Sequence, residues 1–326
     1  MAQVIRRIGV LTSGGDAPGM NAAIRAVVRT ALHMGIECVG IRRGYNGLIN
    51  GDFTPLGFES VSGLSRRGGT MLYSARSEEF RTQEGQEKAV ATCKLLGLDG
   101  VVGIGGDGTY RGLMALSQKG IGVVGIPGTI DNDIAASTYT IGFDTACNTA
   151  LDSIDKLRDT MQSHERCSVV EVMGHTAGHL ALYVGVASGA TCVLVPERKL
   201  DFETDVVEPI RRARLGGRTH FMVIVAEGVA SAFDVAKRIH EETALDTRVT
   251  VLGHVQRGGS PTPRDRVAAT YMGYEAVRLL AEGKTNRVVC MQGDLYVDYD
   301  IEEALNMKKD LDIQTYMVMR ALTGVE

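Results

Sequence analysis

The sequence predicts an α/β fold built on parallel β-sheets. Continuous runs of four to six apolar residues recur along the chain, and most of them end at glycine. Because these runs do not alternate with polar residues, they are typical of strands buried on both faces of a parallel sheet. Helical stretches lie between the runs, and this alternation predicts right-handed crossover connections.

The predicted strands are Ile8–Leu11, Val101–Ile104, Ile121–Ile126, Ser168–Val172, Thr191–Val195, Phe221–Ala226, Val249–Leu252 and Arg287–Met291. The helical stretches between them include Asn21–Met34, Gln86–Leu96, Asn148–Thr160, Ala232–Thr243 and Arg264–Ala281. Ligands of such sheets bind at the carboxyl ends of the strands, and this is where the sequence places its glycines.

Length and composition indicate a globular chain of about two domains. The chain has 326 residues, of which 44% are hydrophobic, enough for a sizeable core. It has 40 glycines but only 7 prolines, so the glycine indicates tight turns and not low complexity. No linker separates two halves, and we expect the change of register near residue 140.

Charge and aromatic content argue against a nucleic-acid binder. Lys and Arg number 35 against 39 Asp and Glu, a net charge of −4. Aromatic residues make up 5%, with no tryptophan, so stacking platforms for single strands are not expected.

Cysteines and hydropathy predict a cytoplasmic protein without a membrane span. The six cysteines form no C-x-x-C pair, and we expect them to be reduced. The first apolar run is too short for a signal peptide. The stretch 172–196 has no Asp, Glu, Lys or Arg, but its glycines and its division into a helix and the strand Thr191–Val195 indicate buried core.

The first glycine turn, residues 14–21, follows a strand and precedes a helix. A helix N-terminus carries free N–H groups and a partial positive charge, so this turn is a candidate phosphate site. An ordinary turn between a strand and a helix is the alternative.

The second turn, residues 103–109, matches the G-x-G-x-x-G dinucleotide pattern only loosely. Its Asp107 would repel a phosphate unless a cation bridged the two, so the turn predicts a Mg²⁺ ion. No Walker A pattern occurs in the chain, which excludes P-loop chemistry.

The third turn, residues 128–133, holds Asp131 and Asp133 at a strand end. Two such carboxylates can divide the work, one accepting a proton from a hydroxyl while the other supports it or a metal. An Asx turn is the alternative, and Ala135 at the third ligand position excludes an EF-hand.

Basic residues stand at further element ends. Arg257 and His254 stand next to a glycine pair after an apolar strand, and Arg76 is a candidate for contact with a transferring phosphoryl group. His175 and His179 have the spacing of a zinc site, but Thr176 stands where a metalloprotease has glutamate, so metal binding there is not favoured.

Together these segments resemble the bacterial ATP-dependent 6-phosphofructokinase family, sugar-phosphate kinases of glycolysis. The segments that carry the resemblance are Thr12–Asn21, Ile104–Thr109, Pro127–Asp133, Val169–Gly174 and Leu252–Ser260, and it extends from Ile8 to about Lys308. It implies two Rossmann-like α/β/α sandwich domains with mostly parallel sheets. Residues 1–141 and 256–306 would form the larger, ATP-binding domain, and residues 142–255 and 307–326 the smaller, sugar-phosphate-binding domain.

The resemblance also implies residue roles. Asp131 would be the general base on the 1-hydroxyl of fructose 6-phosphate, with Thr129, Asp133 and Arg76 beside the reaction, and Asp107 would hold Mg²⁺. The ATP-binding residues would be Gly15, Tyr45, Arg76, Ser77, Gly106, Asp107, Gly108 and Thr109. The sugar-phosphate residues would be Thr129, Asp131, Arg166, Met173, Gly174, His175, Glu227, Arg248, His254 and Arg257.

The resemblance implies a homotetramer in which Arg166 and Arg248 reach the site of a neighbouring subunit. The glycines at positions 108 and 128 resemble those of the family members that use ATP, whereas members that use pyrophosphate typically carry Asp and Lys at these positions. The effector residues would be Arg25, Arg29, Arg158 and Arg218. Thr191, Phe58 and His175 depart from the pattern of regulated members, which argues against activation by ADP and inhibition by phosphoenolpyruvate.

Three other functions fit parts of the sequence. Kinases of NAD or of lipids share the Gly105–Thr109 motif. In a dehydrogenase, Gly103–Gly108 would be the dinucleotide-binding fingerprint, and the protein would bind NAD(H) but not ATP. A nucleotide-sensing subunit would bind ATP without catalysis.

Overall fold

The computed structural model describes residues 5–323, which form two compact units. Unit 1 comprises the described residues up to Ile130, together with Ile134–Thr145 and Arg257–Lys309. Unit 2 comprises Asp131–Asp133, Ala146–Gln256 and the described residues from Asp310 onward. The domain ranges expected from the sequence change at 141, 256 and 306, whereas the compact units change after Thr145, Gln256 and Lys309. The expected ranges also place Asp131–Asp133 in the larger domain, whereas these three residues group with unit 2. The expected domains stay a prediction, and their outermost residues lie outside the described part of the chain.

Unit 1 is built on an eight-stranded sheet in the order β12-β11-β5-β4-β1-β2-β3, with β6 paired to β5. Its strands are β1 (Arg7–Thr12), β2 (Glu37–Ile41), β3 (Phe53–Leu56), β4 (Gly100–Gly105), β5 (Gly122–Thr129), β6 (Ile141–Gly142), β11 (Arg287–Gln292) and β12 (Leu295–Asp300). The central pairs are parallel, and among the described strands only β2 with β3 and β11 with β12 run antiparallel.

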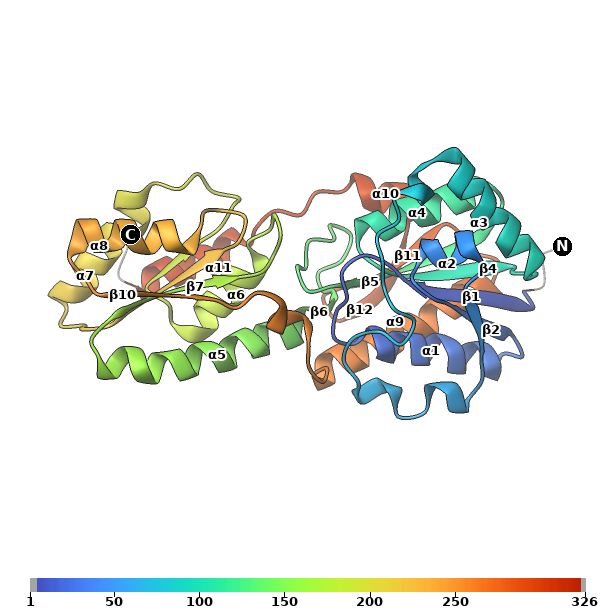
Figure 1. Cartoon of the computed structure of the whole chain (residues 1–326), viewed down its shortest axis with the longest axis horizontal. Helices are drawn as coiled ribbons and strands as arrows, with labels where there is room; N and C mark the ends of the chain where they lie inside the picture. The colour runs from blue at the N-terminus through green and yellow to red at the C-terminus, as the bar shows by residue number, and fades with distance from the viewer. Residues whose placement is uncertain (1–4, 324–326) are drawn as a thin grey trace. The chain divides into compact units, whose positions relative to one another are not determined.

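Helices cover both faces of this sheet (Figure 1). They are α1 (Met20–His33), α2 (Tyr45–Asn50), α3 (Gln83–Leu95), α4 (Asp107–Ser117), α9 (Pro263–Ala281) and α10 (Ile301–Asn306). The helices α1 and α9 pack together on one face. On the other face α2, α3, α4 and α10 enclose a core that includes Leu11, Tyr110 and Leu113, all fully buried.

Unit 2 holds a four-stranded parallel sheet in the order β10-β7-β9-β8. Its strands are β7 (Cys167–Val172), β8 (Cys192–Leu194), β9 (Phe221–Ala226) and β10 (Thr247–Val251). Its helices are α5 (Phe143–Ser163), which begins in unit 1, α6 (His179–Ser188), α7 (Glu208–Leu215), α8 (Ala232–Thr243) and α11 (Ile313–Leu322). The apolar faces of α7 and α8 enclose one core with the sheet, while α5 and α6 lie on its other side (Figure 1).

The predicted α/β fold with mostly parallel sheets is confirmed, and each predicted strand matches an observed one to within three residues at either end. The agreement between predicted and observed ends is best for β9 and α8, which match at both ends, and worst for α5, which begins five residues before the predicted Asn148. Thr191–Val195 forms the shorter β8. The sequence does not predict β2, β3, β6 and β12: β3 and β12 are partly exposed edge strands, β2 lies next to β3, and β6 is only two residues long.

The uncharged stretch 172–196 divides as predicted into the end of β7, the helix α6 and the strand β8. Among the described residues, no helix has the length and hydropathy that a membrane span requires. All six cysteines are buried and unbonded to one another, and burial raises the pKa of Cys93 and of Cys290 to about 12.

Candidate active site

The three glycine turns leave unit 1 at one edge of its sheet. The strands β1, β4 and β5 are neighbours and parallel, with Thr12 paired to Ile104 and Gly105 paired to Pro127. Their carboxyl ends therefore lie side by side, as in other α/β sheets that bind ligands at this edge. Sequence reasoning placed a phosphate or proton-transfer role on each of these turns, and the sheet brings the three turns together.

The second turn is closed against the first by Thr109. Its Oγ1 donates to the carbonyl of Ser13 at 3.1 Å. A Cβ on Gly105 would lie 2.2 Å from that Oγ1 and 2.4 Å from the Ser13 carbonyl, so only glycine fits there. The helix α4 begins directly after Gly106, and no side chain caps it. Its first amides thus face the turn in the manner of a phosphate site.

Asp107 and Gly108 occupy the first turn of α4. The Asp107 side chain is 45% exposed, and its ion pair with Arg111 is long at 3.9 Å. A Cβ on Gly108 would meet nothing within 4 Å, so the space in front of it is open. The described residues contain no cluster of three or more His, Cys, Asp or Glu side chains fit to hold a metal. One carboxylate with phosphate oxygens and water is a usual Mg²⁺ environment, so Asp107 fits that ion.

Tyr45 and Ser77 support the second turn from neighbouring elements. Tyr45 is buried, stacks on Phe80 with the ring centroids 4.1 Å apart, and donates its hydroxyl to the Thr109 carbonyl at 2.5 Å. Ser77 Oγ accepts from the Phe80 amide at 3.2 Å. Tyr45 therefore holds the start of α4 in place and does not itself lie on the surface.

The loop that carries Arg76 is fastened to the first turn. Thr12 Oγ1 donates to the Tyr73 carbonyl at 2.8 Å, and Ser74 Oγ donates to the Gly14 carbonyl at 2.5 Å. Arg76 follows two residues later with an exposed side chain, which makes no ion pair within the described residues. Asn21 on α1 adds a third anchor, because its Oδ1 accepts from the Met71 amide at 2.8 Å.

Arg257 also lies against the first turn. Its Nη1 donates to the Asp16 carbonyl at 3.2 Å, and a Cβ on Gly15 would lie 2.6 Å from the same nitrogen. The resemblance implies a nucleotide-binding role for Gly15 and a sugar-phosphate-binding role for Arg257. In the structure the two residues are in contact within unit 1.

The third turn is largely buried. Thr129, Asp131 and Asn132 are at most 9% exposed, whereas Asp133 is exposed. Asn132 has a φ of 51°, a left-handed conformation that asparagine tolerates well. A Cβ on Gly128 would lie 3.0 Å from Ile104 and 3.2 Å from Met20, so a side chain at 128 fits only if these two side chains shift slightly.

In unit 2, Glu227 organises the loop after β7. One oxygen, Oε1, accepts from the Gly174 amide at 3.3 Å and from the His175 amide at 2.7 Å. Both residues have positive φ, 144° and 54°, a conformation that costs energy at His175. The Glu227 carboxylate thus stabilises this loop, and the His175 side chain remains exposed.

Gln256 holds the same loop at Met173. It is fully buried, and its Oε1 accepts from the Met173 amide at 2.9 Å. It lies in the 3₁₀-helix Gly253–Arg257, which also carries the exposed His254. Sequence reasoning assigned Gln256 no role, because its contact lies 83 residues away along the chain.

Arg166 and Arg248 lie at the other end of the unit 2 strands. Arg166 precedes β7 and Arg248 is the second residue of β10, whereas the Met173 loop follows β7. Both guanidinium groups contact Asp246: Arg166 Nε donates to it at 2.6 Å, and Arg248 Nη1 donates to its other oxygen. Hydrogen bonds from Arg166 lower the pKa of Asp246, and the charge of Arg248 adds to this. A six-residue strand is about 20 Å long, so neither arginine lies beside its own Met173 loop.

The four expected effector residues form two pairs, one in each unit. Arg158 and Arg218 line a cavity of about 150 Å³ in unit 2, together with Thr191 and His220, whose buried Nδ1 has no partner among the described residues. In unit 1, Arg25 and Arg29 lie on α1. Burial and the charge of Arg29 lower the pKa of Arg25.

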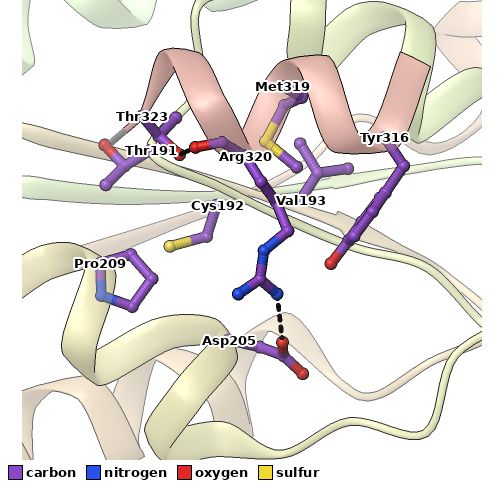
Figure 2. A pocket seen from close by; sticks show the side chains of 9 residues that line it. All are labelled: Thr191, Cys192, Val193, Asp205, Pro209, Tyr316, Met319, Arg320 and Thr323. Carbon is purple, nitrogen blue, oxygen red and sulfur yellow. Dashed lines mark hydrogen bonds and ion pairs between the residues drawn. The ribbon is translucent and has the colours of Figure 1, made fainter. Parts of the chain in front are cut away.

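Phe58 shields the second of these pairs, since the guanidinium of Arg29 lies 3.7 Å from the centroid of its ring. A further hollow in unit 2 lies under α11 (Figure 2). Arg320 crosses it to Asp205 at 3.2 Å. Its volume of about 10 Å³ holds no more than one water molecule, so it is no ligand site.

Comparisons with known proteins agree over most of the chain. Residues 7–280 match the family model described as Phosphofructokinase. A curated protein of Clostridium botulinum named "ATP-dependent 6-phosphofructokinase" is 53% identical over 319 residues, which cover 98% of this chain and 100% of the relative. A protein of the same name from Clostridium tetani is likewise 53% identical, with the same coverage.

Solved structures show the same fold. The phosphofructokinase of Saccharomyces cerevisiae is 34% identical with a TM-score of 0.87, and the match covers 98% of this chain but 47% of that longer chain. A pyrophosphate-dependent phosphofructokinase from Marinobacter aquaeolei has a TM-score of 0.84 at 20% identity, with 95% and 86% of the two chains covered. At that identity the likeness concerns the fold alone.

Proposed function

This chain belongs to the phosphofructokinase family, and we propose that it transfers the γ-phosphoryl group of ATP to the 1-hydroxyl of fructose 6-phosphate. The observation that carries this function is the 53% identity over the full length of relatives named "ATP-dependent 6-phosphofructokinase". The match spans far more than residues 103–109, so it argues against the NAD kinase and lipid kinase alternatives, which depend on the Gly105–Thr109 motif, and against the dehydrogenase alternative, which depends on Gly103–Gly108. The chain is accordingly an alcohol-accepting phosphotransferase.

We propose that the first two glycine turns hold the nucleotide. The uncapped start of α4 and the glycine backbone around it would donate N–H groups to phosphate oxygens. Arg76, whose side chain is exposed beyond the Ser74 anchor, would neutralise charge on the transferring group. A Mg²⁺ ion held by Asp107 would neutralise further phosphate charge when bound.

We propose Asp131 as the general base. Phosphoryl transfer demands little covalent chemistry from the protein beyond positioning, charge neutralisation and removal of the hydroxyl proton. Asp131 is only 8% exposed and stands in a turn that leaves the same sheet edge as the nucleotide turns. Thr129 and Asp133 would assist it. This arrangement keeps water away from the base and supports its role.

We propose that the unit 2 loop binds the sugar phosphate. Glu227 and Gln256 fix the backbone at Met173, Gly174 and His175, and His254 and Arg257 would contact the phosphate of the substrate. Arg166 and Arg248 would come from a neighbouring subunit of a homotetramer, since each lies a strand length from its own Met173 loop.

We also propose that Arg158 and Arg218 form half of an anion site whose other half is Arg25 and Arg29 of another subunit. The cavity of about 150 Å³ is large enough for a small anion, which supports this proposal. Because Thr191 offers no carboxylate and Phe58 covers Arg29, we expect weak responses to ADP and phosphoenolpyruvate.

The first test is a coupled assay of ADP formation with fructose 6-phosphate, ATP and Mg²⁺, repeated with pyrophosphate in place of ATP. We expect turnover with ATP alone. Binding of ATP without turnover would instead indicate a nucleotide-sensing subunit, and turnover with pyrophosphate alone would contradict the assigned donor.

The second test is Asp131→Asn. Loss of the base should lower kcat by at least about 10²-fold with a modest change in KM, because the amide keeps the shape of the side chain but cannot take the proton. Near-normal kcat would remove Asp131 from the mechanism. Asp133→Asn is the neighbouring control, and we expect a smaller loss because Asp133 is exposed.

A further inference from the structure

A buried acid, Asp265, lies at the start of α9 in unit 1. It is the third residue of α9 and is fully buried. No ion pair of Asp265 occurs within the described residues, so hydrogen bonds alone compensate its charge. A buried carboxylate without a cation is costly unless its oxygens are fully hydrogen-bonded.

Four donors satisfy this carboxylate. Its Oδ1 accepts from the Tyr139 hydroxyl and from the Gly142 amide, the latter at 2.7 Å. Its Oδ2 accepts from the amide of Thr145 at 2.9 Å and from the Thr145 hydroxyl at 2.5 Å. A carboxylate offers about four lone-pair positions, so the set is complete. All four donors come from residues 139–145, a single short segment of the chain.

These bonds exceed what a helix cap needs. Thr262 Oγ1 accepts from the Asp265 amide at 3.3 Å, which is one half of a capping box. In the full box the acid would reach back to the amide of Thr262, but that amide donates to Thr145 Oγ1 at 3.0 Å instead. The Asp265 carboxylate is therefore entirely directed at the 139–145 segment.

The segment 139–145 is hydrogen-bonded to the turn that carries Thr129 and Asp131. Gly142 belongs to β6, which pairs in parallel with the end of β5, Ile141 opposite Gly128 and Gly142 opposite Thr129. Thr140 Oγ1 also donates to the Thr129 carbonyl at 2.7 Å. Asp131 follows Thr129 by two residues. A displacement of β6 would consequently move the base.

The packing around β6 is tight. A Cβ on Gly142 would lie 2.6 Å from that of Ala17, and a Cβ on Gly19 would lie 2.6 Å from Ile141. The segment is thus enclosed by the first glycine turn on one side and held by Asp265 on the other. Such a close fit transmits a shift at the acid to the strand above it.

We propose that Asp265 is a positioning residue for phosphoryl transfer, which fixes β6 and through it the Thr129–Asp131 turn. This inference rests on the proposed function. All four donors to the buried Asp265 carboxylate come from residues 139–145 and none from the Gly105–Thr109 turn, so its loss should lower kcat while leaving ATP binding intact.

The test compares Asp265→Asn and Tyr139→Phe with the wild-type chain. In the Asp265→Asn variant an NH₂ group replaces one carboxylate oxygen and points at groups that are themselves hydrogen-bond donors. We expect kcat to fall at least about tenfold with an almost unchanged KM for ATP, as for a reacting group displaced by less than an ångström. Tyr139→Phe removes one donor and keeps the ring, so a smaller fall of kcat is expected. This milder variant decides the matter if Asp265→Asn does not fold.

The matched control is Asp300→Asn. Asp300 also begins a helix of unit 1, where it accepts from the Glu302 amide and from Asn286, but it does not touch β6. It should lose stability in urea without a change in kcat. If kcat falls only in proportion to stability across the three variants, Asp265 is merely structural and the inference is overturned.

A double-mutant cycle gives a second readout. If Asp265 acts through the base, Asp265→Asn or Tyr139→Phe should lower kcat little further in an Asp131→Asn background. Fully multiplicative losses would overturn the inference. A wild-type chain that does not phosphorylate fructose 6-phosphate would contradict the proposed function itself, which is a different result from normal kcat in a folded Tyr139→Phe variant.

Discussion

Gly108 stands in the first turn of α4, and a Cβ at this position would have no neighbour within 4 Å. An alanine there should fit without strain and should even favour the helix slightly. The open space is consistent with room for a nucleotide, and it allows the effect of charge to be separated from the effect of bulk.

We expect Gly108→Asp to weaken ATP use by at least about tenfold in kcat/KM, because like charges about 4 Å apart repel by about 1 to 4 kcal/mol according to the local dielectric. Steady-state kinetics with ATP and with pyrophosphate check this. Gly108→Ala should behave as the wild type; an equal loss in both variants would assign the effect to bulk.

Gly112 on the same helix has the opposite surroundings. A Cβ there would lie 2.3 Å from the Tyr45 ring, which is buried and hydrogen-bonded to the Thr109 carbonyl. Gly112→Ala should thus cost about 1–3 kcal/mol of overpacking and raise the KM for ATP by displacing the start of α4. Urea unfolding and kinetics measure both, with Gly108→Ala as the control on one helix. An unchanged KM would separate Tyr45 from nucleotide binding.

At the scale of one element, α11 depends on its cap. Asp312 accepts from the Thr315 amide at 3.0 Å and from its hydroxyl at 2.7 Å. The helix covers β8 through Tyr316 and Met319, both buried, and through the Arg320–Asp205 ion pair. Hydrogen bonds from the Thr315 amide and hydroxyl lower the pKa of Asp312.

Asp312→Ala should lower the free energy of unfolding by about 1 kcal/mol, as for other caps. Because the folded-state pKa lies below that of the unfolded chain, this contribution is present above the unfolded-state pKa and is lost as the pH falls through the folded-state pKa. Urea titrations at neutral and acidic pH test the sign. Asp312→Ser keeps an acceptor and should retain most of the stability at both pH values.

Elements also show where sequence reasoning ends. The strands β4, β5 and β9 could be predicted because both of their faces are buried and their residues are accordingly uniform in hydropathy. The edge strand β12 contains half-exposed polar residues, and β3 contains a proline, so neither carries that pattern.

Some residues of the candidate site can be predicted from the sequence and others cannot. Turns that follow a strand could be recognised from their glycines and carboxylates, and the sheet order places them at one edge. Gln256, Asp246 and Asp265 escaped because each acts on residues about 80 to 120 positions away, which no local spacing reveals. The assigned roles of the site residues stay predictions until the variants are measured.

At the scale of the whole molecule, the proposed sharing of sites between subunits predicts complementation. An Asp131→Asn chain and an Arg166→Ala/Arg248→Ala chain should each be inactive, yet hybrids made by joint unfolding and refolding should regain about a quarter of the wild-type activity. On random mixing, half of the two-fold interfaces join one chain of each variant. Of the two sites at such an interface, one combines the intact Asp131 of one chain with the intact arginines of the other, and the second site carries both defects. Each variant refolded alone is the control, and activity no greater than their sum would contradict shared sites.

The interrupted layout of unit 1 has a consequence for synthesis. The apolar face of α1 is covered by α9, whose first residue comes 243 positions after that of α1. At about 5–20 residues per second, a nascent chain leaves that face bare for roughly 10–50 s while the ribosome translates the intervening codons. A truncated messenger that ends before α9 would therefore yield an aggregation-prone fragment, and unit 1 can close only after α9 has emerged from the ribosome.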